Sequence, residues 1–375
     1  MTRSHLSHAF RLIIGIFTAF IVLNIGVASA SSDSSGAVYI LTNSPNGNAV
    51  MSWNRAADGA LTLAGSYSTG GTGTGTGLGS QGALILSENH QWLFAVNAGS
   101  NDISVFRVRH ERLVLTQRVP SGGLRPTSLT VHKDLLYVLN ADGAGNITGF
   151  SGAQHGQLAP IANSTRPLSG SATAAAQVQF SPDGDALVVT ERATQTIDTY
   201  RVGKNGLATG PIVNHSAGAV PFGFAFGKRN QLVVSEAGGG QNGLSAASSY
   251  VLKDNGTLTV RSASAQTFQG AACWVVVTKN GRYAYTANAA ASSNSISGFR
   301  ISEHGNLTLL TPDGRTGLTG DGPTDMALSN NSLFLYVRNA RGNSISAFAV
   351  QADGSLQALP GASGLPAGAA GLAAY

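Results

Sequence analysis

Short apolar runs that end in Asn or Glu recur along the whole chain. Within each run the apolar residues cluster or alternate over a few positions, as they do in buried or half-buried β-strands. The runs follow one another at intervals of 43 to 54 residues, which indicates an internal repeat. These anchor residues are Asn43, Asn97, Asn140, Glu191, Glu236, Asn288 and Asn339.

Further strand signals keep their order relative to the anchors. A run such as NSISGF ends in an aromatic residue 9 to 14 positions after each anchor, and in five units an acidic residue or Asn with Gly then starts a leucine-containing strand. Most units also have an apolar strand before the anchor, as at 126–132 and 273–278. The pattern predicts an all-β fold, a seven-bladed β-propeller with four-stranded antiparallel blades over residues 31–375. A β-helix, the main alternative, has repeats of roughly 20 to 30 residues, too short for this unit.

The two ends of the predicted ring complement each other. The first unit lacks a strand before its anchor, and the last residues, 366–375, resemble the strand at 126–132. We therefore expect the C-terminal strand to complete the first blade and close the ring, which leaves fewer open sheet edges. Removal of the last ten residues should then destabilise the whole domain.

Residues 1–30 have the pattern of an export signal. Arg3 and Arg11 precede an apolar run at 12–27, and small residues lead up to Ala30. We expect cleavage after Ala30 and a secreted or periplasmic protein without membrane association. An uncleaved anchor is the alternative, although the run is shorter than the about 20 residues of a membrane-spanning helix.

Composition and charge exclude several kinds of protein. Only 11% of the residues are charged, and the net charge of +5 is not concentrated in a basic run, so nucleic acid is not an expected partner. Cys273 is the only cysteine, which excludes an intramolecular disulfide and a cysteine zinc cluster. The histidines have no metal-ligand spacing. We expect a monomer without a metal or a cofactor.

One rim of the predicted ring collects the candidate site residues. In an up-and-down blade, the start of the inner strand and the end of the second strand lie on the same rim, around a channel that can hold a ligand. Arg192 follows one of the anchors, Glu191. The other candidates are Arg125, Asn140, Phe222, Glu236, Trp274, Asn288, Asp325 and Arg338.

The anchors allow a structural and a functional interpretation. Asn at a strand end often stabilises the turn that follows it, which accounts for the Asn anchors. Glu191 and Glu236 replace Asn in adjacent blades, and two carboxylates on one rim can act as acid and base. The alternative is that both form salt bridges with Arg192 or with neighbouring blades.

The repeated motifs resemble the lactonase family of seven-bladed propellers, which includes 6-phosphogluconolactonase and the carboxymuconate cyclising enzyme. FSPDGDALVV (180–189), TKNGRYAYTANAAASSNSISGF (278–299) and SLFLYVRNARGNSISAF (332–348) carry the resemblance most clearly. The resemblance implies a site with His and Arg at inner-strand starts and Glu and Arg at second-strand ends. Glu236 matches the family's Glu. The expected His and Arg are replaced at Ala174–Ala176, Val220–Gly223 and Ala289.

These observations favour an exported propeller that hydrolyses a small lactone, with Glu236 as general base, aided by Glu191 and Arg192. The remaining rim candidates would bind the substrate. The first alternative is a propeller that binds a glycan, a metabolite or a protein at the rim without catalysis, and a muconate-cyclising type of lyase or isomerase is the second. The export signal argues against 6-phosphogluconolactone, which is a cytoplasmic substrate. We interpret the glycine-threonine run Gly71–Gly77 as a flexible connection rather than a phosphate site, since no Lys-Ser/Thr follows it.

Overall fold

The apolar repeats form seven β-sheets in the described part of the chain, residues 1–2, 35–109 and 112–375 of a computed structural model. Each sheet is one blade, whose strands follow one another from the inside of the ring outwards. Blade 1 consists of β30 (Ala370–Ala374), β1 (Gly36–Leu41), β2 (Ala49–Arg55) and β3 (Leu61–Ser68). Blade 2 consists of β4 (Leu84–Leu86), β5 (Trp92–Asn97), β6 (Asp102–Arg109) and β7 (Arg112–Pro120).

The next three blades continue around the ring. Blade 3 consists of β8 (Leu124–His132), β9 (Leu135–Asp142), β10 (Asn146–Ser151) and the short β11 (Ala159–Pro160) and β12 (Arg166–Pro167), with the 3-10 helix η1 (Ala153–His155). Blade 4 consists of β13 (Ala175–Phe180), β14 (Ala186–Glu191), β15 (Thr196–Val202) and β16 (Ala208–His215). Blade 5 consists of β17 (Pro221–Phe226), β18 (Gln231–Glu236), β19 (Ala246–Leu252) and β20 (Leu258–Gln266), with η2 (Gly238–Gly240).

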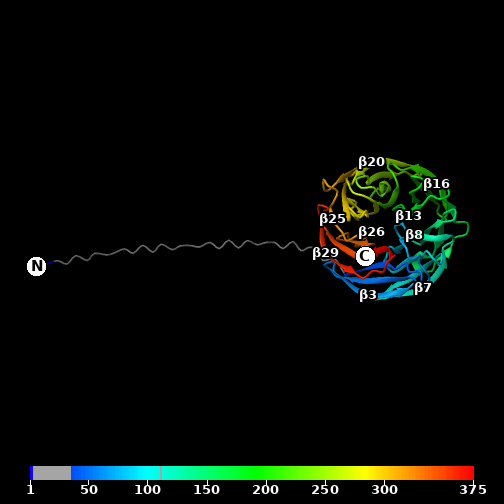
Figure 1. Cartoon of the computed structure of the whole chain (residues 1–375), viewed down its shortest axis with the longest axis horizontal. Coiled ribbons are helices and arrows are strands. Elements are labelled where there is room, and N and C mark those ends of the chain that lie inside the picture. The colour runs from blue at the N-terminus through cyan, green and yellow to red at the C-terminus, as the bar shows by residue number, and fades with distance from the viewer. Residues whose placement is uncertain (3–34, 110–111) are drawn as a thin grey trace. The chain divides into compact units, whose positions relative to one another are not determined.

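The last two blades lead back to the first. Blade 6 consists of β21 (Ala272–Val277), β22 (Tyr283–Asn288), β23 (Ser295–Ile301) and the short β24 (Leu307–Leu309) and β25 (Gly317–Leu318). Blade 7 consists of β26 (Pro323–Leu328), β27 (Phe334–Asn339), β28 (Ser344–Val350) and β29 (Leu356–Ser363). Down the axis of the ring, β8, β13 and β26 lie near the centre and β3, β7, β16, β20 and β29 at the periphery (Figure 1).

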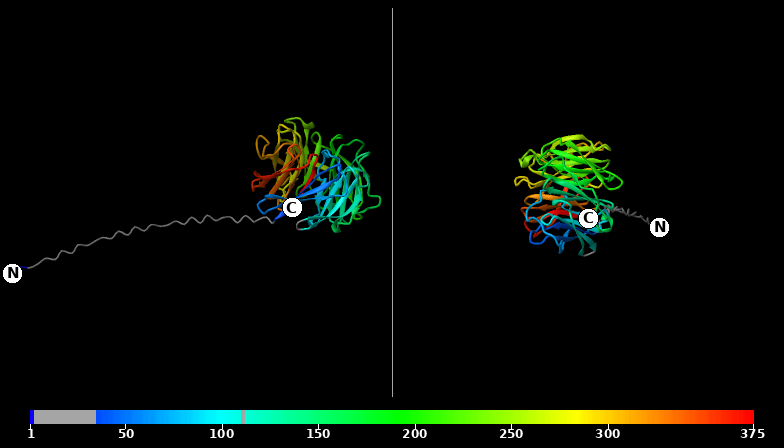
Figure 2. Two further views of the ribbon diagram at one scale, coloured as in Figure 1. Left: turned by 60° about the horizontal axis from the view of Figure 1, so that its bottom comes forward. Right: turned by 90° about the vertical axis from the view of Figure 1, so that its right-hand side faces the viewer.

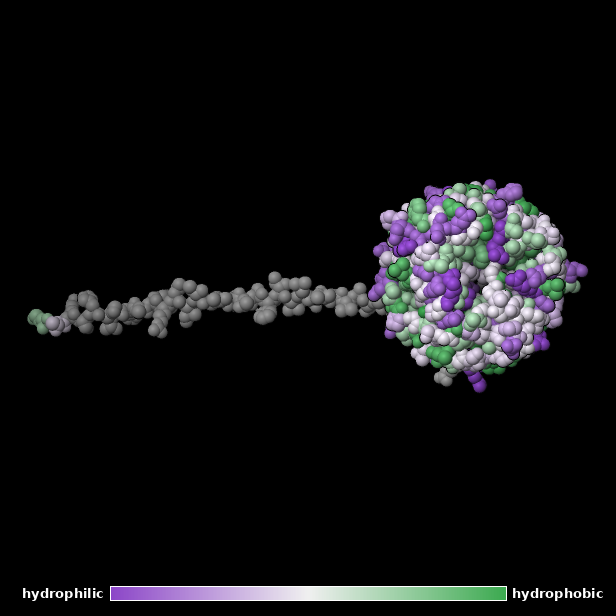
Figure 3. Space-filling model, in the orientation of Figure 1, coloured by the Kyte–Doolittle hydropathy of each residue, from purple (hydrophilic) through white to green (hydrophobic). Residues whose placement is uncertain are grey.

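The apolar core lies between neighbouring blades. The second strands β5, β14, β18, β22 and β27 are buried at every residue, because each is covered on both faces by the adjacent blades. This explains why the second strands read as nearly continuous apolar runs. On the face of the ring seen in Figure 3, hydrophobic residues are scattered singly among polar ones.

The C-terminal strand closes the ring, as predicted. Strand β30 pairs antiparallel with β1 and supplies the innermost strand of blade 1. The red end of the chain therefore lies beside the blue first blade (Figure 2). The carbonyl oxygen of Tyr375 accepts a hydrogen bond from Arg55 Nε at 3.0 Å, and its ring stacks on His90 with centroids 5.1 Å apart.

Inner-strand starts and second-strand ends share one rim, as the sequence predicts. Pro221 pairs with Glu236 in blade 5, and Pro323 pairs with Asn339 in blade 7. We call this the strand-start rim. The predicted signal peptide falls almost entirely in residues 3–34, outside the described residues. No helix within the described residues is long and apolar enough to cross a membrane.

Candidate active site

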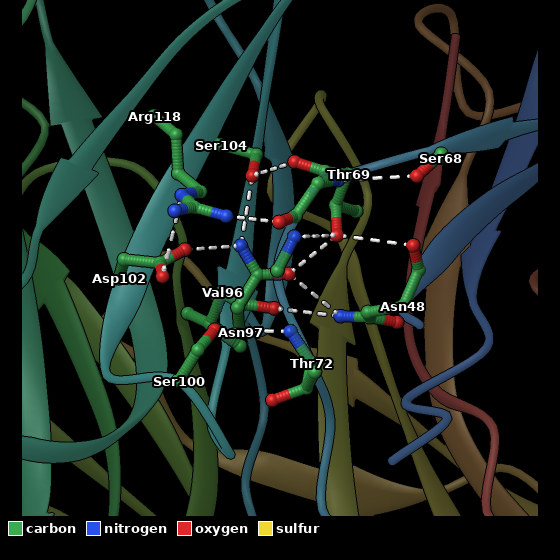
Figure 4. Close-up of polar contacts among 12 residues, drawn as sticks. Asn48, Ser68, Thr69, Thr72, Val96, Asn97, Ser100, Asp102, Ser104 and Arg118 are labelled. Carbon is green, nitrogen blue, oxygen red and sulfur yellow. Dashed lines mark hydrogen bonds and ion pairs between the residues drawn. The ribbon is translucent and has the colours of Figure 1, made fainter. Parts of the chain in front are cut away.

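The anchors at the second-strand ends join neighbouring blades. Asn97 Oδ1 accepts hydrogen bonds from Thr69 Oγ1 at 2.7 Å and Asn48 Nδ2 at 2.9 Å, both in blade 1 or the loop that follows it. Its Nδ2 donates to Asp102 Oδ1 at 2.6 Å and Ser104 Oγ at 2.8 Å in blade 2 (Figure 4). Asn97 thus uses its full amide hydrogen-bonding capacity in a joint between two blades.

Asn140 and Asn288 are the corresponding anchors of blades 3 and 6, although the Oδ1 of each has no hydrogen-bond partner among the described residues. Asn140 Nδ2 donates to Asn146 Oδ1 at 2.9 Å, and Asn288 Nδ2 donates to Ser297 Oγ at 2.9 Å and Ser295 Oγ at 3.1 Å. Both anchors are fully buried. The structural interpretation of the Asn anchors fits these contacts, although the partners are mainly side chains of the third strand rather than the turn itself.

Glu191 lies in the corresponding joint of blade 4. It is fully buried, and its carboxylate accepts hydrogen bonds from Thr194 Oγ1 at 2.6 Å, from Thr196 Oγ1 at 3.0 Å and from both the N–H and the hydroxyl of Ser169. Asp198, where blade 2 has Ser104, is also fully buried beside it. Burial and the neighbouring Glu191 raise the pKa of Asp198 to about 8. Burial opposes ionisation of Glu191, but hydrogen bonds from Asp198, Ser169 and Thr194 lower its pKa.

Glu236 lies in the joint of blade 5. Its side chain is 2% exposed, and its carboxylate accepts hydrogen bonds from the hydroxyls of Ser248 and Ser264, the latter at 2.7 Å. Burial raises its pKa in spite of these bonds. A β-carbon on Gly218 would lie 2.0 Å from Glu236 Oε2, so the glycine of the connection packs directly against the carboxylate. Within the described residues neither glutamate forms a salt bridge, with Arg192 or with any other cation.

A segment between blades 1 and 2 runs across the centre of the strand-start rim. We call Leu78–Gln81 the crossing segment. Ser80 Oγ donates to the carbonyl of Thr127 in blade 3 at 2.8 Å. On the far side of the ring, Gln81 Nε2 donates to the carbonyl of Val275 at 2.7 Å, and its Oε1 accepts from the N–H of Val275 at 3.0 Å. The crossing segment, which leads into blade 2, therefore spans the channel between blade 3 and blade 6.

A cavity of about 250 Å³ lies between the crossing segment and blades 6, 7 and 1. Asp325 and Arg338 both line it and are only 3% and 6% exposed. Asp325 Oδ1 accepts a hydrogen bond from the N–H of Met326 at 3.0 Å. Within the described residues, Asp325 Oδ2 and Arg338 Nε have no hydrogen-bond partner. Unpartnered buried atoms also occur in the blade joints, at Asn140 Oδ1 and Asn288 Oδ1, but Asp325 and Arg338 differ in that both line one cavity.

The charges of these two groups suit proton transfer near neutral pH. Burial raises the pKa of Asp325 to about 7, against the opposing effects of the Arg338 charge and of the backbone N–H groups of Met326 and Leu372. Burial lowers the pKa of Arg338 to about 10, so the guanidinium stays charged at neutral pH. Asp325 also lines the central channel, a second cavity of about 400 Å³ that runs along the inner strands. Strongly shifted carboxyl groups at such cavities are typical of functional sites.

The aromatic candidates form one wall of the site. Trp274 lines the cavity, and its Nε1 donates to the carbonyl of Ser80 in the crossing segment at 2.9 Å. Phe222 packs on Trp274 with ring centroids 4.9 Å apart, and the guanidinium of Arg192 lies 5.1 Å from the centroid of Phe222. This stack holds Arg192 at the rim, where its Nε donates to a backbone carbonyl at 2.9 Å.

Arg125 lies further out on the same rim. It forms a 3.0 Å ion pair with Asp142, and its Nη2 donates to the carbonyl of Leu78 at 3.3 Å. The structure therefore brings Trp274, Asp325 and Arg338 together around one cavity. It places Phe222, Arg192 and Arg125 at the rim beside the cavity. It leaves Asn140, Glu191, Glu236 and Asn288 in the blade joints, none of them lining the cavity.

The crossing segment is the part of the site that sequence reasoning missed. The run Gly71–Gly77 that leads to it connects blades 1 and 2, as predicted, and is hydrogen-bonded to the loop after β1. The N–H of Gly73 donates to the carbonyl of Ser44 at 2.7 Å, and Asn43 Nδ2 donates to the carbonyl of Thr76 at 2.6 Å. The repeat pattern contained no strand signal between 77 and 83, so nothing marked these residues as part of the rim.

The fold is that of a seven-bladed β-propeller with a cavity at one rim. The model of the seven-bladed β-propeller lactonase family matches residues 32–168 and 177–367. The chain belongs to this family. A comparison with curated protein sequences gives no significant match.

Solved structures with the same fold include proteins with lactonase names. The periplasmic gluconolactonase of Pseudomonas aeruginosa is 18% identical with a TM-score of 0.74, over 91% of this chain and 99% of that one. A candidate 6-phosphogluconolactonase from Bacteroides fragilis is also 18% identical with a TM-score of 0.74, over 92% and 99%. A protein from Lactobacillus plantarum is 16% identical with a TM-score of 0.73, over 91% and 99%. At these identities the likeness establishes the fold alone.

Proposed function

We propose that the protein hydrolyses a small lactone in the cavity at the strand-start rim, with Asp325 as general base and Arg338 as the group that stabilises the oxyanion. One observation carries this proposal. A buried carboxyl oxygen without a donor and a buried guanidinium nitrogen without an acceptor, as far as the described residues go, line the same cavity. Membership in the lactonase family gives the reaction class.

The chemistry of lactone hydrolysis matches these two groups. Water attacks the ring carbonyl carbon, and Asp325 accepts the proton that the water loses. Negative charge develops on the carbonyl oxygen, and the Arg338 guanidinium can donate to it. The ring C–O bond then breaks, and its oxygen takes up a proton, which gives a hydroxy acid. A base with a pKa of about 7 is well matched to this step near neutral pH.

Glu236 as general base remains a prediction, but its contacts favour a structural role. Its carboxylate accepts hydrogen bonds from Ser248 and Ser264, and it is not among the residues that line the cavity. Each of its two oxygens accepts a hydrogen bond from one serine hydroxyl, and these bonds favour the ionised form without occupying all the acceptor sites. Glu191 also lies outside the cavity lining and has four donors around it.

The test is hydrolysis of aliphatic, aromatic and sugar lactones, followed by proton release. Asp325→Asn should lower kcat by about 100-fold or more, the usual contribution of a general base. Asp321→Asn is the matched control, because Asp321 lies on the same rim but is exposed and paired with Arg341. Glu236→Gln is measured beside it. Loss of turnover in Glu236→Gln but not in Asp325→Asn would reject Asp325 as the base and restore the Glu236 hypothesis.

Absence of turnover on every lactone would reject the hydrolase proposal. Ligand binding without turnover would then support the alternative, a propeller that binds a glycan, a metabolite or a protein at the rim. Circular dichroism of each variant separates a loss of chemistry from a loss of folding.

We also propose that residues 1–30 direct export and are removed. The support is the pattern of Arg3 and Arg11, the apolar run at 12–27 and the small residues before Ala30. N-terminal sequencing of protein collected outside the cytoplasm tests this. A mature protein that begins at Ser31 would support cleavage at the expected site, and one that retains Met1 would contradict it.

A further inference from the structure

The cavity that contains Asp325 and Arg338 offers few partners for a polar substrate. The hydroxyl of Ser80 donates to the carbonyl of Thr127 at 2.8 Å, and that of Thr324 donates to the carbonyl of Arg338 at 3.3 Å. The indole N–H of Trp274 is also used, since it donates to the carbonyl of Ser80. The other lining residues have no polar side-chain atoms and are Gly77, Leu78, Gly79, Ala340, Ala370 and Gly371.

A sugar lactone would be poorly matched to this lining. Each of its hydroxyl groups needs a hydrogen-bond partner when it is buried. Asp325 and Arg338 are the side chains in the lining with polar atoms that no described residue pairs, and both are needed at the reacting carbonyl. The oxygens of Ser80 and Thr324 could still accept from a sugar hydroxyl, but no further side chain of the lining would donate to one, and such incomplete pairing is what enzymes use to reject a substrate.

A phosphorylated sugar lactone would be matched still less well. Phosphate groups are bound by clusters of cationic groups or backbone N–H donors. Among the described residues, Arg338 is the one cationic side chain in the cavity lining, and Asp325 shares its surroundings. Arg192, the next cation on the rim, lies beside the lining residue Gly79, but it is stacked on Phe222 and its Nε donates to a backbone carbonyl.

The size and the wall of the cavity fit a single apolar ring. A volume of about 250 Å³ equals the liquid volume of roughly eight water molecules, enough for a six-membered lactone with a short substituent. Trp274, backed by Phe222, offers a flat apolar wall for the face of such a ring.

We infer that the substrate is a small monocyclic lactone whose ring carries few or no hydroxyl groups, and not a sugar lactone. This rests on the proposed lactonase function and deepens it. It also separates this chain from the gluconolactonase and 6-phosphogluconolactonase names of the solved structures that share its fold. The hydrocarbon part of the ring lies against Leu78 and Trp274, and the carbonyl lies between Asp325 and Arg338.

The test compares two lactones with the same six-membered ring. The full-length protein, as purified after any natural processing, is assayed with δ-valerolactone and with glucono-δ-lactone. We expect kcat/KM for δ-valerolactone to exceed that for glucono-δ-lactone by about 100-fold or more. Equal rates, or faster hydrolysis of the sugar lactone, would overturn the inference.

A gain-of-polarity variant tests the physical cause. Ala340→Ser adds a hydroxyl to the cavity wall and should narrow the preference by several-fold. Ala291→Ser, an exposed position away from the cavity, is the control and should leave the preference unchanged. The same ratio in Ala340→Ser and in the wild type would show that the polarity of the cavity wall does not set the preference.

A binding measurement keeps the inference separate from the proposed function. δ-Valerolactam has the same ring size and an amide in place of the ester, and it resists hydrolysis. We expect it to raise the Tm of the wild type and of Asp325→Asn, and we expect gluconolactam not to do so. If no lactone is hydrolysed, the proposed function fails, but this selectivity would still support the substrate class. Binding of gluconolactam alone, or of neither compound, would overturn it.

Discussion

Two buried acids, Glu236 and Asp325, differ in what surrounds them rather than in how deeply they are buried. Glu236 is 2% exposed and Asp325 is 3% exposed. Glu236 accepts hydrogen bonds from two serine hydroxyls in the joint of blade 5. Asp325 keeps one oxygen without a donor among the described residues and lines two cavities. Burial raises the pKa of both groups, but only Asp325 adjoins space that a substrate could occupy.

The comparison shows that a carboxylate on the right rim is not sufficient evidence of a catalytic site. The two joint glutamates replace the usual Asn, and both accept hydrogen bonds from serine or threonine hydroxyls. The cavity acid leaves its network incomplete. Empty volume beside an unsatisfied polar atom is the more informative sign of function.

We expect the largest effect in the free energy of unfolding of Glu236 variants. Glu236→Ala should destabilise the fold by about 2–4 kcal/mol, because it leaves a buried void and two hydroxyls without their acceptor. Urea unfolding measures the loss. Glu236→Gln keeps the shape and should cost less. A Glu236→Ala protein as stable as the wild type would show that the joint does not depend on this side chain.

The pH dependence of activity tests Asp325. Because the base must be deprotonated and its pKa is about 7, kcat/KM should fall about tenfold for each pH unit below 7 and level off above it. The measurement is a pH-rate profile from pH 5 to 9. The Glu236→Gln variant should show the same fall of kcat/KM below pH 7. A flat profile over the same range would contradict a role for Asp325 as base.

The pH dependence of stability tests the acid pair of blade 4. Folded Asp198 keeps its proton up to about pH 8, whereas the unfolded chain loses it near pH 4. The folded state therefore binds the extra proton in this window, and this group lowers stability as pH rises, by at most about 1.4 kcal/mol per unit. Asp198→Asn keeps a donor toward Glu191 and removes this slope. Thermal unfolding of both proteins from pH 4 to 9 measures the difference. Parallel curves would show that Asp198 does not hold a proton.

The smallest effect is expected at the exposed part of the rim. Arg125 pairs with Asp142, and their side chains are 37% and 51% exposed. Arg125→Gln should change stability by less than about 1 kcal/mol, since solvent screens exposed ion pairs. Its effect on lactone turnover should also be small, because Arg125 does not line the cavity. A large loss of turnover would place Arg125 in the site, and a large loss of stability would show that solvent does not screen the ion pair.

The sequence was sufficient for the fold because every blade repeats the same physical requirements. Three features recur in the same order in the repeats: the buried second strand, the polar residue at its end and the turn before the outer strand. The strands of one blade could therefore be predicted with the help of the other blades. The missing strand of blade 1 even indicated how the ring closes.

The site was harder to predict because it departs from the repeat. The change from Asn to Glu at positions 191 and 236 drew attention to the joints, but its compensation by Asp198 and Ser264 became visible only in three dimensions. Asp325 and Arg338 were recognised as rim residues. Their partnership depends on the crossing segment, where Gln81 reaches Val275 across the ring, 194 residues away in the chain. No local pattern reports such a contact.

The pairing of β30 with β1 also fixes the order in which this protein can be completed. The innermost strand of the first blade is synthesised after every other strand of the ring, so blade 1 keeps an open edge until β30 has emerged from the ribosome. A prematurely terminated chain, even one that lacks only residues 370–375, leaves that edge unpaired and exposed to proteases and to aggregation. The position of β30 thus makes closure of the ring depend on synthesis through residue 374.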